Sequence, residues 1–140
     1  MTARRPYTKP LELLRSASLR PTRQRLALCR LLFDDGPRHV TAEQLHSEAL
    51  AANVRVSLAT VYNTLHQFTT AGLLREIVVE AGRSYFDTNV SDHHHLFHEE
   101  TGELTDIPGQ DVVISRIPEP PEGSRIGRVD VIVRLRRDPA

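Results

Sequence analysis

Apolar residues recur every three to four positions from residue 10 to residue 68, which predicts a series of amphipathic helices. The spacing predicts a short helix over residues 10–17, a second over 22–33 and a third over 41–51. Thr22 and Thr41 stand at positions that favour N-caps, and Thr41 opens a capping box. The first half of the chain is therefore expected to be largely helical.

The next segment, residues 57–68, has the pattern of a recognition helix. Its buried face is expected to carry Leu58, Val61, Leu65 and Phe68, with Ser57 as the N-cap and Gly72 ending the helix. The outward face is expected to carry Thr60, Tyr62, Asn63 and Thr64. Such side chains read base edges and thymine methyls in a major groove. The third and fourth helices together predict a helix-turn-helix.

Two strand-like runs follow at residues 73–80 and 83–88, joined by a turn at 80–82 that carries a glycine. A hairpin directly after a recognition helix indicates a wing. Beyond it, strands are expected at 93–98, 103–107 and 127–137, and prolines leave room for only a short helix at 110–116. The exposed edge of so small a sheet favours pairing with a second subunit.

The expected fold class is α+β: an N-terminal winged helix-turn-helix domain followed by a small α/β dimerisation domain. Residues 1–88 are expected to form the DNA-binding domain and 89–92 a hinge. Residues 93–140 are expected to form the dimerisation and sensing domain.

The formal net charge of zero conceals an asymmetry between the two halves. Residues 1–90 hold 12 Lys and Arg against 8 Asp and Glu, whereas residues 91–140 hold 6 against 10. The first 25 residues contain one acidic residue, Glu12, and seven basic ones: Arg4, Arg5, Lys9, Arg15, Arg20, Arg23 and Arg25. This bias suits a polyanion such as double-stranded DNA, although a solvated helix face is the ordinary alternative.

The cysteine count and the hydropathy pattern limit the class of protein. One cysteine, Cys29, excludes an internal disulfide and a zinc site built from cysteine pairs, and its apolar neighbours favour a buried structural role. No signal-peptide core and no apolar run of about 18 residues is present. A cytoplasmic protein with no membrane partner is expected.

Candidate chemistry concentrates in a histidine-rich run at residues 92–98. Alternation along a strand would place His93 and His95 on one face and Asp92, His94 and His98 on the other. Partners from elsewhere in the chain are His39, Asp87, Asp106 and Asp130. Mixed imidazole and carboxylate ligands suit Mn, Fe or Zn, and imidazoles also bind haem iron. The histidine run is therefore compatible with either a metal ion or haem as the ligand. A histidine-rich edge strand without any ligand is the remaining alternative.

These segments resemble the ferric uptake regulator (Fur) superfamily, and most closely its iron response regulator (Irr) branch. The resemblance rests on residues 19–28, 39–46, 57–74, 84–89, the histidine run, 101–107 and 128–137. It implies a homodimeric repressor of iron homeostasis that binds AT-rich inverted repeats when iron is scarce. It also implies release or inactivation by haem at His93, His94 and His95.

The resemblance also implies two metal sites. The first corresponds to His39, Asp87, His93 and His95, and the second to Asp92, His94, Asp106 and Asp130. The expected ion is Mn²⁺ or Fe²⁺, with Zn²⁺ possible in vitro. No structural zinc on four cysteines is expected, because His98 and Thr101 stand where the family has its first cysteine pair.

For DNA, the resemblance places Arg20 at the minor groove or backbone and Tyr62 on thymine methyls. Arg23 and Arg25 are candidate phosphate contacts. Ser57, Thr60, Asn63 and Thr64 complete the expected interface. Asn63 replaces an arginine that is common in the superfamily, so the preferred operator is not expected to match that of other members.

The sequence offers two alternatives to a haem-responsive regulator. A metalloenzyme is disfavoured, because the chain has no HExxH motif, nucleophile elbow or glycine-rich phosphate loop. A Fur-type repressor that senses Mn²⁺, Zn²⁺ or Fe²⁺ without responding to haem has the same expected fold and dimer. It differs only in the ligand that changes DNA binding.

Overall fold

The computed structural model describes residues 8–80 and 82–139. These divide into two compact units, the first ending at Val90 and the second beginning at Ser91. Arg4, Arg5 and the turn residue Ala81 lie outside the described residues. Among the described residues, no helix is both long and apolar enough to cross a membrane. The α+β class is confirmed, with helices in the first unit and mainly strands in the second.

Four helices build the first unit: α1 (Thr8–Ser16), α2 (Arg23–Phe33), α3 (Ala42–Ala51) and α4 (Leu58–Thr70). Three begin at the expected caps, since Thr22, Thr41 and Ser57 each accept a hydrogen bond from a backbone N–H three residues later. Gly72, at φ 83°, ends α4 in a Schellman arrangement in which the amide of Leu73 donates to the carbonyl of Phe68. Local signals therefore fix the helix boundaries.

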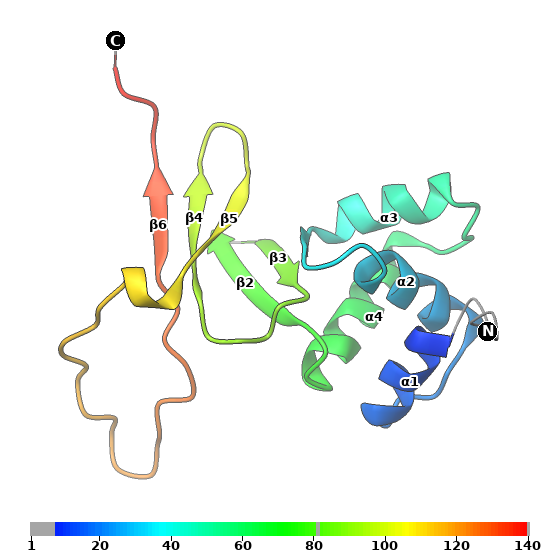
Figure 1. Cartoon of the computed structure of the whole chain (residues 1–140), viewed down its shortest axis with the longest axis horizontal. Coiled ribbons are helices and arrows are strands. Elements are labelled where there is room, and N and C mark those ends of the chain that lie inside the picture. The colour runs from blue at the N-terminus through cyan, green and yellow to red at the C-terminus, as the bar shows by residue number, and fades with distance from the viewer. Residues whose placement is uncertain (1–7, 81, 140) are drawn as a thin grey trace, which may run out of the picture. The chain divides into compact units, whose positions relative to one another are not determined.

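A three-stranded antiparallel sheet completes this unit in the order β1-β3-β2 (Figure 1). β2 (Arg75–Glu80) and β3 (Arg83–Asp87) form the expected hairpin, with a bulge between Val78 and Glu80. β1 (His39–Val40) was not expected from the sequence, because its two residues are too short to show a period. It lies between α2 and α3 in the chain and pairs with β3.

The core of the first unit lies among its helices. Consecutive helices pack against one another, and Leu28, Leu45, Val61, Leu65 and Phe68 are fully buried there. Cys29 belongs to the same core, as expected, and burial raises the pKa of its thiol to about 12. Such a thiol is an apolar packing group and not a nucleophile.

The second unit is a three-stranded sheet in the order β5-β4-β6 (Figure 1). β4 (His94–His98) is antiparallel to β5 (Leu104–Ile107) and parallel to β6 (Ile132–Leu135). The helix expected at 110–116 is wrong: a single 3-10 turn, η1 (Gly109–Asp111), replaces it. Pro108 precedes this turn, and the prolines from Pro118 onward leave no length for an α-helix.

Candidate nucleic-acid interface and metal-ligand sets

The recognition helix predicted from the sequence is α4. Ser57 is its N-cap, because the Ser57 hydroxyl accepts a hydrogen bond from the amide of Thr60 at 3.1 Å. The same hydroxyl donates to the hydroxyl of Thr60 at 2.9 Å. Asn63 is exposed, and Tyr62 and Thr60 are half-buried. These three side chains therefore stand at or near the surface, as a base-reading role requires.

Thr64 differs from the expectation, because only 5% of its surface is exposed. It lies one turn beyond Val61 and next to Leu65, so the helical period carries it onto the face that packs into the core. The expectation that Thr64 points outward is wrong. A contact between its side chain and a base edge would require α4 to repack.

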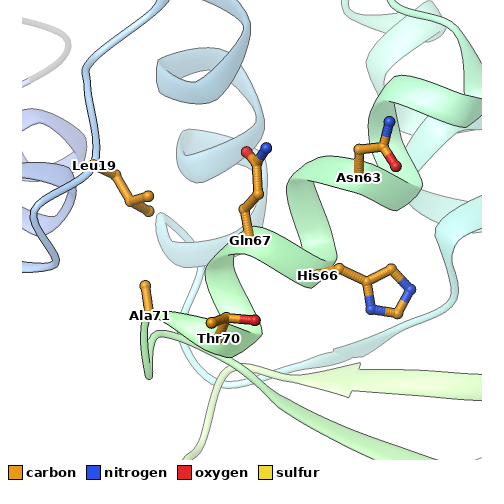
Figure 2. A pocket seen from close by; sticks show the side chains of 6 residues that line it. All are labelled: Leu19, Asn63, His66, Gln67, Thr70 and Ala71. Atoms are coloured by element: carbon orange, nitrogen blue, oxygen red, sulfur yellow. The ribbon is translucent and has the colours of Figure 1, made fainter.

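The exposed face of α4 extends further along the helix than the sequence argument placed it. Asn63, His66, Gln67 and Thr70 line a hollow of about 520 Å³ together with Leu19 and Ala71. Figure 2 labels these six side chains. His66 and Gln67 follow Asn63 by three and four residues, which is the helical repeat. That repeat was the signal available in the sequence for adding them to the surface.

Two arginines expected at the DNA are exposed: Arg20 lies in the connection between α1 and α2, and Arg23 begins α2. Arg25 is more constrained. Its guanidinium donates to the carbonyl of Arg20 and to Oε1 of Gln67, both at 2.9 Å. Arg25 thus ties the α1–α2 connection to α4 and keeps a positive charge beside the exposed face.

The first set of metal-ligand candidates lies in the first unit and consists of His39 and Asp87. Antiparallel register places the two residues directly opposite each other on β1 and β3. Nε2 of His39 lies 3.2 Å from Oδ2 of Asp87, whose surface is only 1% exposed. The other carboxylate oxygen, Oδ1, accepts from the amide of Asn89 at 2.9 Å. Asp87 is thus buried and held by the backbone, while His39 keeps 17% of its side chain exposed.

Arg38 fixes the strand that carries His39. Its guanidinium donates to both carboxylate oxygens of Glu48, at 2.8 and 2.6 Å, and to the carbonyl of Leu31 at 3.1 Å. Its backbone exchanges hydrogen bonds with Thr88, through its amide to the hydroxyl and through its carbonyl to the amide. Bidentate pairing of this kind gives a fixed geometry. Arg38 therefore holds β1 in place beside β3.

Glu48→Ala is expected to lower the free energy of unfolding by about 1–2 kcal/mol, because it removes a charged, partly buried hydrogen-bonding partner. The hydrogen bond from Arg38 lowers the pKa of Glu48. The carboxylate thus stabilises the fold above the ordinary glutamate pKa of about 4.3, and this contribution is lost as the pH falls. Urea unfolding at several pH values measures it.

Asp34→Ala is the matched control, because its ion pair with Arg30 is half exposed and contributes little. The Glu48→Ala deficit should shrink between pH 7 and pH 4. A deficit that is the same at both pH values contradicts the assigned role of the carboxylate.

The second set of ligand candidates lies in the second unit and consists of His93, His95 and Asp106. Oδ1 of Asp106 lies 3.2 Å from Nε2 of His93 and 3.3 Å from Nε2 of His95. One ligand atom of each lies within 4.8 Å of the others. Two donors bound to one ion at about 2.1 Å lie roughly 3.0–3.4 Å apart at octahedral or tetrahedral angles. The spacing fits such an ion.

The position of the ring proton on His93 also favours an ion at this place. Its Nδ1 lies 2.6 Å from the carbonyl of Ser91, which has no proton to give, so Nδ1 carries the proton and donates. In neutral His93, Nε2 then presents a lone pair toward the carboxylate of Asp106. Two acceptors face each other stably only when a cation, either a proton or a metal ion, lies between them.

The expected second site is not assembled in this way. β4 and β5 pair His95 with Asp106 and His94 with Ile107, so the assignment of Asp106 to the His94 face is wrong. Nδ1 of His94 accepts from the amide of Val131 at 3.0 Å, and Asp130 pairs with Arg128 at 3.0 Å. In the described chain, Asp92, His94 and Asp130 join no cluster of three ligand candidates. Their metal roles stay predictions.

Comparison with known proteins identifies the class of molecule that carries these features. The family model described as the ferric uptake regulator family matches residues 16–121. The chain belongs to the ferric uptake regulator family. A ferric uptake regulation protein of Bordetella parapertussis is 33% identical over 100 residues, which cover 71% of this chain and 72% of that protein.

A peroxide-responsive repressor of Staphylococcus aureus is also 33% identical, over 67% of this chain and 63% of that protein. Among solved structures, the manganese-bound ferric uptake regulator of Pseudomonas aeruginosa matches the fold with a TM-score of 0.72 at 24% identity. That match covers 94% of this chain and all of the other. This likeness shows the fold: a helical first unit followed by a β-sheet second unit.

Fur-family membership sets the general function of the chain. It is a metal-responsive transcriptional regulator that binds DNA, and it is not an enzyme. Proteins of this family bind DNA as dimers. Neither the Irr branch nor a response to haem follows from these relatives, which are named for ferric uptake and for peroxide.

Proposed function

We propose that this Fur-family protein is a dimeric, cytoplasmic repressor whose affinity for AT-rich promoter DNA depends on a bound divalent metal ion, Mn²⁺, Fe²⁺ or Zn²⁺. The proposed ligands are His39, Asp87, His93 and His95, together with Asp106, which we move from the second predicted set to this one because its carboxylate lies beside His93 and His95. This is the ion-sensing alternative from the sequence analysis. The names of the relatives favour it over a haem sensor.

One observation carries the proposal: the imidazoles of His93 and His95 converge on one carboxylate oxygen of Asp106. Both histidines are more than nine-tenths buried. The two imidazoles have lost most of their water, whereas Asp106 is 43% exposed, so a cation beside the carboxylate would replace the hydration that the two ring nitrogens lack. Imidazole and carboxylate together suit Mn²⁺, Fe²⁺ and Zn²⁺.

The resemblance to the family implies that one ion takes ligands from both sets, and the proposal adopts this. When bound by both sets, an ion would supply positive charge and tie the two units together. Binding of the ion would then favour the dimer geometries in which both sets can reach it. The affinity for DNA would change with the population of those geometries.

The dimer itself is supported by the surface of the second unit. Its connecting segment exposes large apolar side chains at Val113, Ile114, Ile117 and Ile126, and the edge strand β6 adds Val133. Several exposed apolar side chains in one small unit and an open strand edge both favour association with a second copy.

Haem remains the competing ligand, as the resemblance to the Irr branch implies for His93, His94 and His95. His94 offers the specific support, because it is only half-buried and a ligand can reach it. The hydrogen bond from Val131 counts against this role: Nδ1 accepts it, so Nε2 carries the ring proton and would have to lose it to bind iron. The histidines at 93 and 95 are instead directed at Asp106. Their arrangement favours an ion.

Fluorescence anisotropy on an AT-rich inverted-repeat duplex separates the two ligands. The metal-free protein is titrated with Mn²⁺, then with a chelator, and in a second series the Mn²⁺-loaded protein is titrated with haem. An ion sensor gains DNA affinity with Mn²⁺ and loses it on chelation. Release by haem from wild type, but not from a His93, His94, His95 triple alanine variant, would support a haem sensor instead.

The basic surface gives a separate prediction about salt. Arg23→Ala is expected to reduce the slope of log affinity against log salt by about one, because a phosphate contact releases about one counterion. Binding to the same duplex is measured at several salt concentrations. Arg30→Ala is the control, since Arg30 lies at the other end of α2 in an ion pair with Asp34. Equal slopes for Arg23→Ala and wild type contradict the phosphate role.

A further inference from the structure

Tyr62 on the recognition helix is held by a residue from the neighbouring helix. Its phenol donates a hydrogen bond to Oε1 of Glu43 at 2.7 Å, and Glu43 lies in the first turn of α3. This contact lowers the pKa of Glu43, so the carboxylate is ionised at neutral pH. The bond therefore links the two helices of the helix-turn-helix through a charged acceptor.

The ring of Tyr62 is also supported along its face. It stacks on the ring of His66 with centroids 6.5 Å apart and an interplanar angle of 18°. His66 in turn meets the buried ring of Phe86 edge to face at 5.5 Å and 82°. Phe86 belongs to β3, so the row of rings begins in the core and ends at the surface of α4. Tyr62 is thus fixed at its hydroxyl and along one face.

This arrangement decides which chemistry Tyr62 presents to DNA. The hydroxyl has one proton, and Glu43 already accepts it. What remains toward a groove is the apolar edge of the ring and a hydroxyl oxygen that can only accept, and apolar contact is how a thymine methyl is read. A phosphate oxygen is repelled from the same place by the charge of Glu43.

We infer that Glu43 is a positioning residue for sequence reading, which holds the ring of Tyr62 where it contacts thymine methyls and keeps its hydroxyl from phosphates and base acceptors. This rests on the proposed DNA-binding function of α4. A side chain ordered before binding loses less freedom on the DNA. Loss of Glu43 is therefore expected to cost about three- to tenfold in discrimination at that thymine.

The test uses full-length protein loaded with Mn²⁺ and a duplex that wild type enriches from a random-sequence pool. Each thymine of that duplex is replaced in turn by deoxyuridine, which removes only the methyl. Wild type is expected to lose about three- to tenfold in affinity at the thymine that Tyr62 contacts. In Glu43→Ala, the same replacement should change the affinity little, which means that the discrimination is lost. Glu43→Gln keeps an acceptor and should retain most of the wild-type discrimination.

A double-mutant cycle shows whether Glu43 acts through Tyr62. Tyr62→Phe removes only the hydroxyl, and its effect on discrimination should not add to that of Glu43→Ala. Glu12→Ala removes an acidic charge from α1 and controls for charge alone. Thermal unfolding of each variant checks that the fold is kept.

The outcomes are distinct. Additive effects of Glu43→Ala and Tyr62→Phe, or unchanged thymine discrimination in Glu43→Ala, would overturn the role of Glu43. The role would also be overturned if Glu43→Ala only raised the affinity for every duplex alike and Glu12→Ala did the same. A wild type that enriches no duplex contradicts the proposed function itself.

Discussion

Replacing His95 with alanine is expected to weaken Mn²⁺ binding by at least about 100-fold. Loss of a residue that only orients a metal ligand typically costs about 10–100-fold, and His95 is proposed to be a ligand itself. Its side chain is 3% exposed and its Nε2 lies 3.3 Å from Oδ1 of Asp106, so the substitution removes a nitrogen donor from the proposed ligand set. Competition with a chromophoric chelator measures the affinity.

His98→Ala provides a matched control on the same strand. Alternation along β4 places His98 on the opposite face from His95, with His94. Its loss is expected to change Mn²⁺ affinity by less than about threefold. If His98→Ala and His95→Ala weaken binding equally, the ligand set assigned from the sheet register is wrong.

Phe68→Ala is expected to lower the free energy of unfolding of the first unit by about 3–5 kcal/mol. Phe68 is fully buried among the helices, and truncation would both remove its apolar surface and leave a cavity in the core. Urea unfolding followed by far-ultraviolet circular dichroism, which reports on the helices, measures the loss. DNA binding should fail at the same urea concentration as the helical signal.

Thr70→Ala is the control for this substitution, since Thr70 is exposed near the end of the same helix. It is expected to change the free energy of unfolding by about 0.5 kcal/mol or less. A cost below about 1 kcal/mol for Phe68→Ala contradicts the core described above.

The parts of the fold that the sequence predicted are those determined by neighbouring residues. Thr22, Thr41 and Ser57 mark helix starts because a capping hydroxyl bonds an amide only three residues away. The wing hairpin was likewise predicted, because its two strands are joined by a short turn with Gly82. Local chemistry decides such boundaries.

The parts that were missed depend on pairing across the chain. β1 exists because two residues meet β3 nearly fifty residues later, and no local pattern shows this. The placement of Asp106 failed for a related reason. Which face of β5 it occupies depends on the register set by the turn after β4, and shifting that register by one residue would reverse the face.

Thr64 shows the limit of assigning helix faces by residue polarity. Polarity suggested an outward position, but its place between Val61 and Leu65 puts it toward the core. Candidate metal ligands could be proposed from the sequence because four of its seven histidines fall within residues 93–98, and their metal roles stay predictions. The ligand that they bind does not follow from residue type alone, because the same imidazoles bind an ion or haem iron.

The most direct test of the central claim, that metal and DNA binding are linked, is the Mn²⁺ affinity of the protein with and without its duplex. Linkage is reciprocal, so DNA should tighten Mn²⁺ binding by the same factor by which Mn²⁺ tightens DNA binding. The account predicts equal factors, of about fivefold or more, in wild type. An Mn²⁺ affinity that DNA leaves unchanged would contradict it.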